Sequence, residues 1–269
     1  MDYLQLFKES IRLVRKNKLI WLFAILSMLS SFLPNIRSFQ NVLIRLCLFI
    51  PSGVAAFIPL IATPGSFYLL YRADRDIPTT FEEAWGRGIA SALRSVGLGF
   101  LVAPMLLVLF GIYYYSALKW NTTLWPFIAL LIAVPFTTIY FWGVCAIAIH
   151  DAKATQAAEI SLGISAKHVE DILIINAAYS LLRVLFLALV LIILALSPLS
   201  TSLPNPIELN FLTYQKINAI PAVSWATKLL DLLTWPWWLA VLTKTYTIFV
   251  PKDEGELPPV ETMAVTEGE

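Results

Sequence analysis

Residues 125–149 read WPFIALLIAVPFTTIYFWGVCAIAI, a run of 25 residues without a charged side chain. As a helix rising about 1.5 Å per residue, such a run is longer than the roughly 30 Å of hydrocarbon in a bilayer. Comparable apolar stretches predict further spans at about 18–33, 51–71, 95–115, 172–196 and 223–250, with an interfacial segment at 42–50 before the second. The sequence therefore predicts an all-α, polytopic membrane bundle with six transmembrane helices over residues 1–250.

Composition agrees with a membrane bundle. The chain is 58% hydrophobic and 14% charged, whereas a soluble domain is nearer half apolar and a quarter charged. A net charge of +1 indicates no nucleic-acid partner. Cys47 and Cys145 both fall in apolar stretches, which predicts small buried side chains rather than a disulfide. We expect no cofactor and no metal, because nucleotide-binding motifs and Cys/His clusters are absent from the sequence.

An amphipathic segment precedes each pair of predicted spans, at 2–17, about 80–94 and 151–170. In the first, Leu4, Phe7, Ile11 and Val14 fall on one stripe and the basic residues fall elsewhere. This pattern is typical of a helix lying in the membrane interface.

The second amphipathic segment carries helix-start signals. Thr79 or Thr80 is suited to cap it, with Glu82 or Glu83 three residues later completing a capping box. Glu83 and Arg87 are spaced to form an i,i+4 ion pair.

The three units share a spacing. Phe7-Lys-Glu-Ser, Phe81-Glu-Glu-Ala and Ala154-Thr-Gln-Ala begin corresponding stretches 74 and 73 residues apart. This predicts a threefold repeat of hairpin units, each preceded by a cytoplasmic amphipathic helix. The alternative is three ordinary hairpins of similar length.

Basic residues are distributed unequally across the predicted membrane. Thirteen Lys and Arg residues lie on the N-terminal side, and five lie on the other side: Arg37, Arg45, Lys119, Lys216 and Lys228. By the positive-inside rule, both termini are cytoplasmic in a multi-pass protein of the cell (inner) membrane. Residues 251–269 are acidic and lack large aromatics, which predicts a disordered cytoplasmic tail.

The stretch Glu82-Glu83-Ala-Trp-Gly-Arg87 matches the EExxxR element of the CAAX-type intramembrane proteases. That family also needs Phe-x-x-x-His and a histidine followed four residues later by Asn or Asp. The two histidines, His150 and His168, fit neither pattern. A protease is therefore a remote alternative, and we predict no catalytic residues.

Polar residues inside the predicted spans suggest a second candidate site, formed by Arg183, Asn176, Thr137 and Thr138. A charge within a span costs a few kcal/mol unless it meets a partner or water. Arg183 could contact an anionic substrate or lipid headgroup in the bundle, or extend to the inner headgroups. Near the outer end of the sixth span, Lys228 and Asp231 are spaced to pair with each other.

Two short stretches carry a family resemblance: Phe7-Lys-Glu-Ser with Lys16-Asn-Lys-Leu-Ile-Trp21, and Thr80-Phe-Glu-Glu-Ala-Trp85. With the similar layout at 154–196, they resemble six-span bacterial membrane proteins. These include the membrane domain of some glycerophosphodiester phosphodiesterases and the YciC-like inner-membrane proteins. The resemblance implies an inner-membrane protein without catalysis of its own, since the phosphodiesterase chemistry belongs to a separate soluble domain.

Two functions follow from these features. The first is a non-catalytic membrane subunit or scaffold that binds membrane lipids or a partner protein through its cytoplasmic helices. The second is a small permease or exporter with a site near Arg183. The candidate cytoplasmic interface consists of Arg12, Arg15, Lys16, Glu82, Glu83, Trp85 and Arg87.

Overall fold

The computed structural model describes residues 1–32, 42–120, 125–195 and 221–250, and every regular element in these ranges is an α-helix. The predicted tail 251–269 and the outer loops lie outside the described residues. The helices are α1 (Tyr3–Lys16), α2 (Leu19–Phe32), α3 (Val42–Asp74), α4 (Phe81–Trp120), α5 (Trp125–His150), α6 (Ala154–Lys167), α7 (Val169–Ala195) and α9 (Pro221–Phe249).

Four helices match predicted spans closely, and two differ. The ends of α2, α5, α7 and α9 lie within three residues of the predicted bounds. The segment at 42–50 is not separate from the next predicted span, because α3 runs through both as one helix. The amphipathic segment at 80–94 and the span predicted from about 95 form one continuous helix, since α4 runs from Phe81 to Trp120. At Asn17, by contrast, the backbone leaves the helical region and α1 ends.

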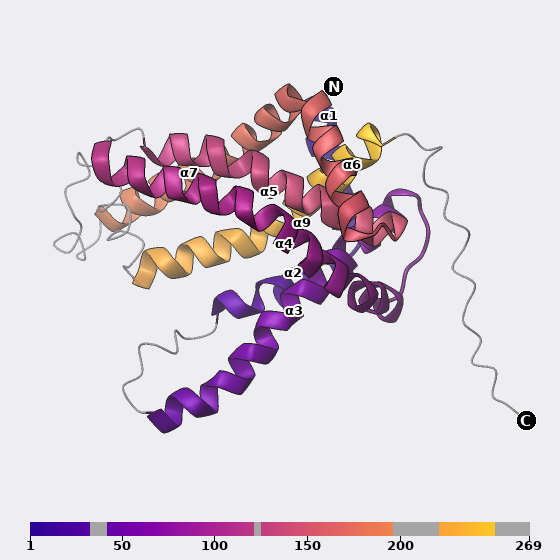
Figure 1. Cartoon of the computed structure of the whole chain (residues 1–269), viewed down its shortest axis with the longest axis horizontal. Coiled ribbons are helices and arrows are strands. Elements are labelled where there is room, and N and C mark those ends of the chain that lie inside the picture. The colour runs from indigo at the N-terminus through magenta and orange to yellow at the C-terminus, as the bar shows by residue number, and fades with distance from the viewer. Residues whose placement is uncertain (33–41, 121–124, 196–220, 251–269) are drawn as a thin grey trace, which may run out of the picture.

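The helices form three units in a cyclic arrangement. Each unit has a leading helix (α1, residues 81–94 of α4, or α6), an outward helix (α2, the rest of α4, or α7) and a returning helix (α3, α5 or α9). The three returning helices contact one another, and each leading helix contacts the returning helix of the preceding unit: α4 on α3, α6 on α5, and α1 on α9. Figure 1 shows α1 and α6 together at one end of the bundle.

Aromatic rings fill the space between the returning helices. Phe67 and Phe141 are 74 residues apart, the same spacing as Phe7 and Phe81, and their ring centroids lie 6.3 Å apart. The ring of Trp235 lies 5.6 Å from that of Phe141. The same hydrophobic cluster contains fully buried aliphatic residues of the returning helices, among them Leu70, Ile147, Leu239 and Leu242. The centre of the described bundle is therefore apolar.

Small residues lie where the leading helices cross the returning ones. Ser10, Ala84 and Ala157 occupy the fourth position of the three repeat stretches, and all three are fully buried. A Cβ added at Gly88 would lie 2.3 Å from the carbonyl oxygen of Ile61. Helix backbones approach this closely only where side chains are small.

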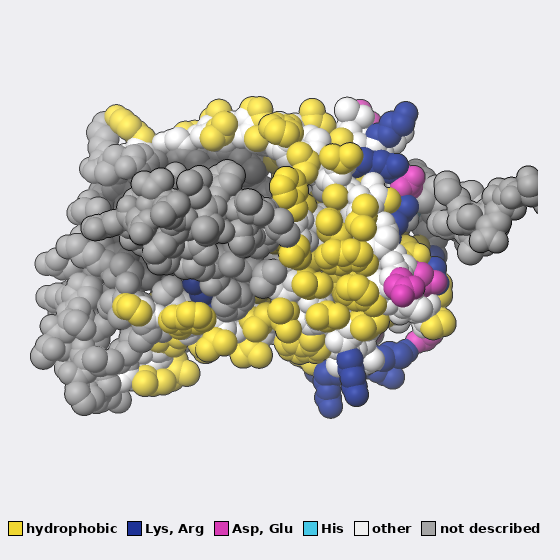
Figure 2. Space-filling view, turned by 90° about the horizontal axis from the view of Figure 1, so that it is seen from below, with side chains coloured by type: hydrophobic (Ala, Val, Ile, Leu, Met, Phe, Trp, Pro, Cys, Tyr) yellow, Lys and Arg dark blue, Asp and Glu magenta, His cyan; other side chains and the backbone are white. Residues whose placement is uncertain are grey.

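The outer surface of the described helices is largely apolar. Figure 2 shows hydrophobic side chains over the middle of the molecule and most of the charged ones at one end. By length and composition, Phe81–Met105 and Val169–Val190 are long and apolar enough to cross a membrane. The described residues also include two shorter apolar helices, Leu19–Met28 and Thr137–His150.

The contact at Gly88 yields a stability prediction. Replacing Gly88 with alanine should destabilise the protein by about 1–3 kcal/mol, because backbone rather than a flexible side chain occupies the space. Gly86→Ala on the same helix is the matched control, since an added Cβ there meets nothing within 4 Å. That variant should be neutral, or stabilised by up to about 1 kcal/mol. Thermal unfolding of both variants in one detergent measures the difference, and equal midpoints would contradict close contact at Gly88.

Candidate functional site

A three-way ion pair joins α1, α3 and α9 at the charged end of the bundle. Lys244 Nζ lies 2.8 Å from Glu9 Oε2 and 2.9 Å from Asp74 Oδ1, and the lysine side chain is only 15% exposed. Donation from Lys244, with a second hydrogen bond from Gln5, holds the pKa of Glu9 below its usual range. The contact fixes the leading helix of the first unit to the last helix of the chain.

The N-terminal turn of α1 is joined to α7. Tyr3 donates a hydrogen bond of 2.5 Å to Asp171 Oδ1, and this bond raises the pKa of Tyr3 to about 12. Asp171 Oδ2 lies 3.3 Å from Nδ1 of His168, whose ring stacks on Phe249 at a centroid distance of 3.8 Å. Asp171 therefore joins Tyr3 of α1 to His168, and the His168 ring in turn contacts Phe249 of α9.

Arg87 joins α4 to the end of α5. Its Nε donates to the Ala148 carbonyl at 2.7 Å, and its Nη1 donates to Asp151 Oδ1 at 2.8 Å. Arg94 donates to the same carboxylate oxygen at 2.6 Å. The predicted Glu83–Arg87 pair is therefore wrong, because the last-turn carbonyls of α5 and Asp151, which follows α5, attract the guanidinium instead.

The predicted capping box is confirmed for Thr80 and Glu83. The Thr80 hydroxyl accepts from the Glu83 amide at 3.2 Å, and the Glu83 carboxylate accepts from the Thr80 amide at 3.1 Å. Glu82 is exposed. Trp85 stacks on Phe81 at 5.7 Å and lies 6.1 Å from Phe23 of α2, so its ring packs partly within the protein.

The basic residues of α1 that we assigned to the interface remain at the surface. Arg12 and Arg15 are exposed and form no ion pair among the described residues. Lys16 pairs with Asp76, which lies in the turn after α3, and that contact lowers the pKa of Asp76. The candidate interface is thus divided: Glu83, Arg87 and Lys16 are engaged within the protein, and Arg12, Arg15 and Glu82 face outward.

Two of the predicted in-membrane polar residues meet. Asn176 of α7 donates to the Thr138 hydroxyl of α5 at 2.9 Å and to the Ile172 carbonyl at 2.9 Å. Both side chains are buried. Thr137 is exposed and lies apart from this pair on the surface of α5.

Arg183 has a partner that sequence reasoning missed. Its Nη2 lies 2.7 Å from Asp231 Oδ1 on α9, and its guanidinium also lies over the Tyr179 ring. The predicted Lys228–Asp231 pair is wrong, since Lys228 lies over the Trp225 ring instead, 5.2 Å from its centroid. The Arg183 side chain on α7 therefore reaches across to the Asp231 carboxylate on α9.

The histidines and Glu83 have other contacts in the described residues. In the described ranges, no group of three or more His, Cys, Asp or Glu side chains is arranged to hold a metal ion. The Glu83 carboxylate is engaged in the helix cap, and the rings of His150 and His168 contact aromatic neighbours. The arrangement is suited to joining helices.

Comparison with known proteins yields no match among family models, curated proteins or solved structures. The resemblance to six-span bacterial membrane proteins therefore stays a prediction.

The Arg183–Asp231 pair is expected to couple α7 and α9 energetically. Replacing either residue with alanine leaves the other charge partly buried without its partner. The stability losses of the two single variants should therefore add up to more than the loss in the double variant. A double-mutant cycle on thermal unfolding in detergent should give a coupling of about 0.5–3 kcal/mol.

The pair Lys228 and Asp231 is the matched control for that cycle. Lys228→Ala combined with Asp231→Ala should show a clearly smaller coupling, because Lys228 is directed to Trp225. Equal couplings in the two cycles would contradict a specific pairing of Arg183 with Asp231.

Proposed function

We propose that the chain is a six-span protein of the cell membrane, with both termini in the cytoplasm, acting as a non-catalytic scaffold or subunit. Its cytoplasmic end, built from α1, the start of α4, and α6, is the surface offered to membrane lipid or to a partner. The proposal rests on the outer surface of the described helices, the apolar centre and the buried Asn176–Thr138 hydrogen bond.

The exposed surface supports membrane placement. The side chains of Leu93, Phe100 and Leu107 on α4 are 84%, 76% and 70% exposed. Large contiguous apolar surfaces of this kind are rare on monomeric soluble proteins. Only 28% and 19% of the most apolar stretches of the two long candidate spans are buried. Core helices of soluble proteins, by contrast, are mostly buried.

The apolar centre carries the choice of scaffold over permease. A permease needs a polar, hydrated path between its helices, whereas Phe67, Phe141 and Trp235 fill the space between the returning helices. The buried polar pair Asn176 and Thr138 satisfies itself by mutual hydrogen bonds.

A small permease or exporter remains the second candidate because of Arg183. Its side chain is 39% exposed, and that of Asp231 is 26% exposed, so the pair is incompletely enclosed. An ionisable residue inside a span is a functional-site hypothesis by default. Transport would require α7 to separate from α9, which would break this ion pair.

Cysteine labelling tests the six-span proposal. Single cysteines within 1–17, 72–94, 151–170 and 251–269 of a cysteine-free protein should react with an impermeant maleimide only when the cytoplasmic face is accessible. The positive-inside distribution supplies the reason. Labelling of 251–269 from outside the cell would require an odd number of spans and would sink the proposal.

A further inference from the structure

The face of α1 turned away from the bundle combines apolar and basic side chains. Lys8, Ile11 and Arg15 follow Leu4 by four, seven and eleven residues, so all four lie along one side of the helix. Leu4 is 64% exposed and Ile11 48% exposed, and both basic residues are exposed as well. We name these four residues the outer stripe. The opposite face is buried and consists of Leu6, Ser10, Leu13 and Val14.

The acidic residues of α1 and its cap are engaged elsewhere. Asp2 accepts from the Gln5 amide at 3.1 Å, which caps the helix. Glu9 pairs with Lys244. Lys8 and Arg15 form no ion pair among the described residues, and the exposed Lys18 follows them at the end of the helix. The outer stripe therefore presents positive charge without a neutralising partner of its own.

The other leading helices do not repeat this pattern. At the repeat spacings of 74 and 73 residues, Lys8 corresponds to Glu82 and Thr155, and Arg15 corresponds to Ile89 and Leu162. The basic stripe thus belongs to one unit of three. It is a local feature rather than a requirement of the shared architecture.

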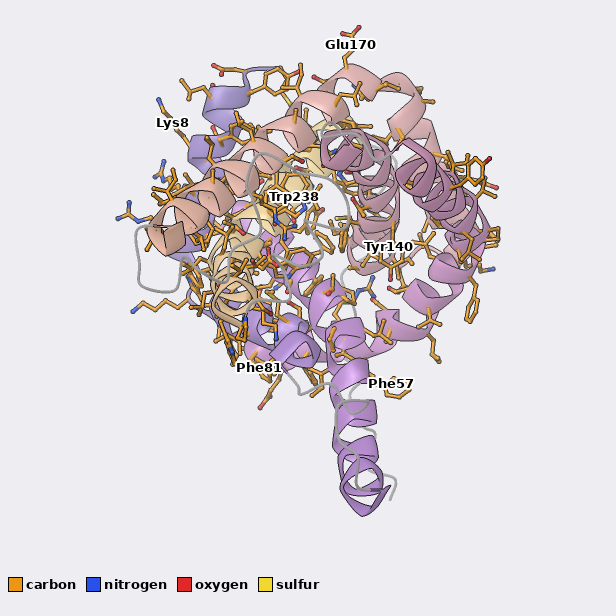
Figure 3. All side chains as sticks on the ribbon, turned by 90° about the vertical axis from the view of Figure 1, so that its left-hand side faces the viewer. Lys8, Phe57, Phe81, Tyr140, Glu170 and Trp238 are labelled. Carbon is orange, nitrogen blue, oxygen red and sulfur yellow. The ribbon has the colours of Figure 1, made fainter. Side chains whose placement is uncertain are left out.

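The stripe borders the apolar surface. Figure 3, a view along the bundle, shows Lys8 directed sideways, away from the bundle. Beyond Asn17, the exposed side chains of Trp21, Leu22 and Ile25 continue the apolar surface along α2. The outer stripe thus alternates cations with exposed aliphatic groups at the edge of an apolar surface. Such a pattern is suited to the boundary between lipid headgroups and acyl chains, where phosphate and hydrocarbon are both within reach.

We infer that the outer stripe binds anionic phospholipid of the cytoplasmic leaflet. Lys8 and Arg15 contact lipid phosphate, while Leu4 and Ile11 rest among the first acyl carbons. The inference rests on the proposed membrane placement. Lipid is favoured over an acidic protein because the exposed aliphatic residues lie between the cations and continue into the apolar surface of α2.

The test uses the purified full-length chain in detergent with added dioleoyl phosphatidylglycerol or, for comparison, dioleoyl phosphatidylcholine. The thermal unfolding midpoint should rise with the anionic lipid and much less with the zwitterionic one. Lys8→Gln/Arg15→Gln should weaken the apparent affinity for phosphatidylglycerol roughly tenfold or more, since each cation contributes about 1 kcal/mol near anionic lipid. High salt should weaken the wild-type response in the same direction.

Two controls separate binding from folding. Lys153→Gln/Lys167→Gln removes two exposed cations from the ends of α6, where no alternating stripe exists, and should reduce the lipid response clearly less than Lys8→Gln/Arg15→Gln does. Lys8→Arg/Arg15→Lys keeps both charges and should retain it. The Gln variant should unfold at the wild-type temperature in phosphatidylcholine, because its side chains are exposed.

Three results would overturn the inference: no preference of the wild-type protein for phosphatidylglycerol, an unchanged response in Lys8→Gln/Arg15→Gln, or an equal loss in the α6 control. Binding of an acidic peptide to the stripe without any lipid preference would assign the surface to a protein partner instead. None of these results would affect the cysteine-labelling test of the six-span proposal. Labelling of the N-terminus from outside the cell would contradict the proposed function, whereas the preference for phosphatidylglycerol in detergent would be measured independently of it.

Discussion

At Gly88 the backbone of α4 comes so close to α3 that an added Cβ would lie 2.3 Å from the Ile61 carbonyl oxygen. One turn earlier, Ala84 of α4 and its counterparts Ser10 of α1 and Ala157 of α6 are small and fully buried. Without a hydrophobic driving force between helices in lipid, close backbone contact is a main source of helix association. The cyclic order of leading and returning helices depends on these crossings.

Once the helices approach this closely, their polar groups have to find partners within the protein. Lys244 joins three helices through Glu9 and Asp74, and Arg87 takes up the last-turn carbonyls and the acidic residue at the end of α5. Farther along the bundle, Arg183 meets Asp231. Each of these contacts holds together helices that are distant in sequence, so the charged groups support the architecture that the small residues permit.

The apolar runs were sufficient to predict the helices, because a long uncharged run has few other structures open to it. Burial was harder to predict. Leu4 and Ile11 belonged to the predicted apolar stripe of α1, yet both are exposed, while Ser10 is buried. The buried face is centred elsewhere on the helix, on Leu6, Ser10, Leu13 and Val14, so Val14 is the one member of the predicted stripe that is buried. The partners of Lys244, Arg87 and Arg183 come from distant helices, and a single sequence carries no signal of that proximity.

The accessibility of Cys145 tests the account most directly. Its side chain is fully buried on α5 among the returning helices. In a Cys47→Ala protein held in native membranes, a small water-soluble methanethiosulfonate should leave Cys145 unmodified until detergent denaturation exposes it. A Lys8→Cys variant, with its cysteine at the surface, should react within minutes under the same conditions. Rapid modification of Cys145 in the folded protein would show that water reaches the centre of the bundle, which would contradict the dry scaffold and favour a permease.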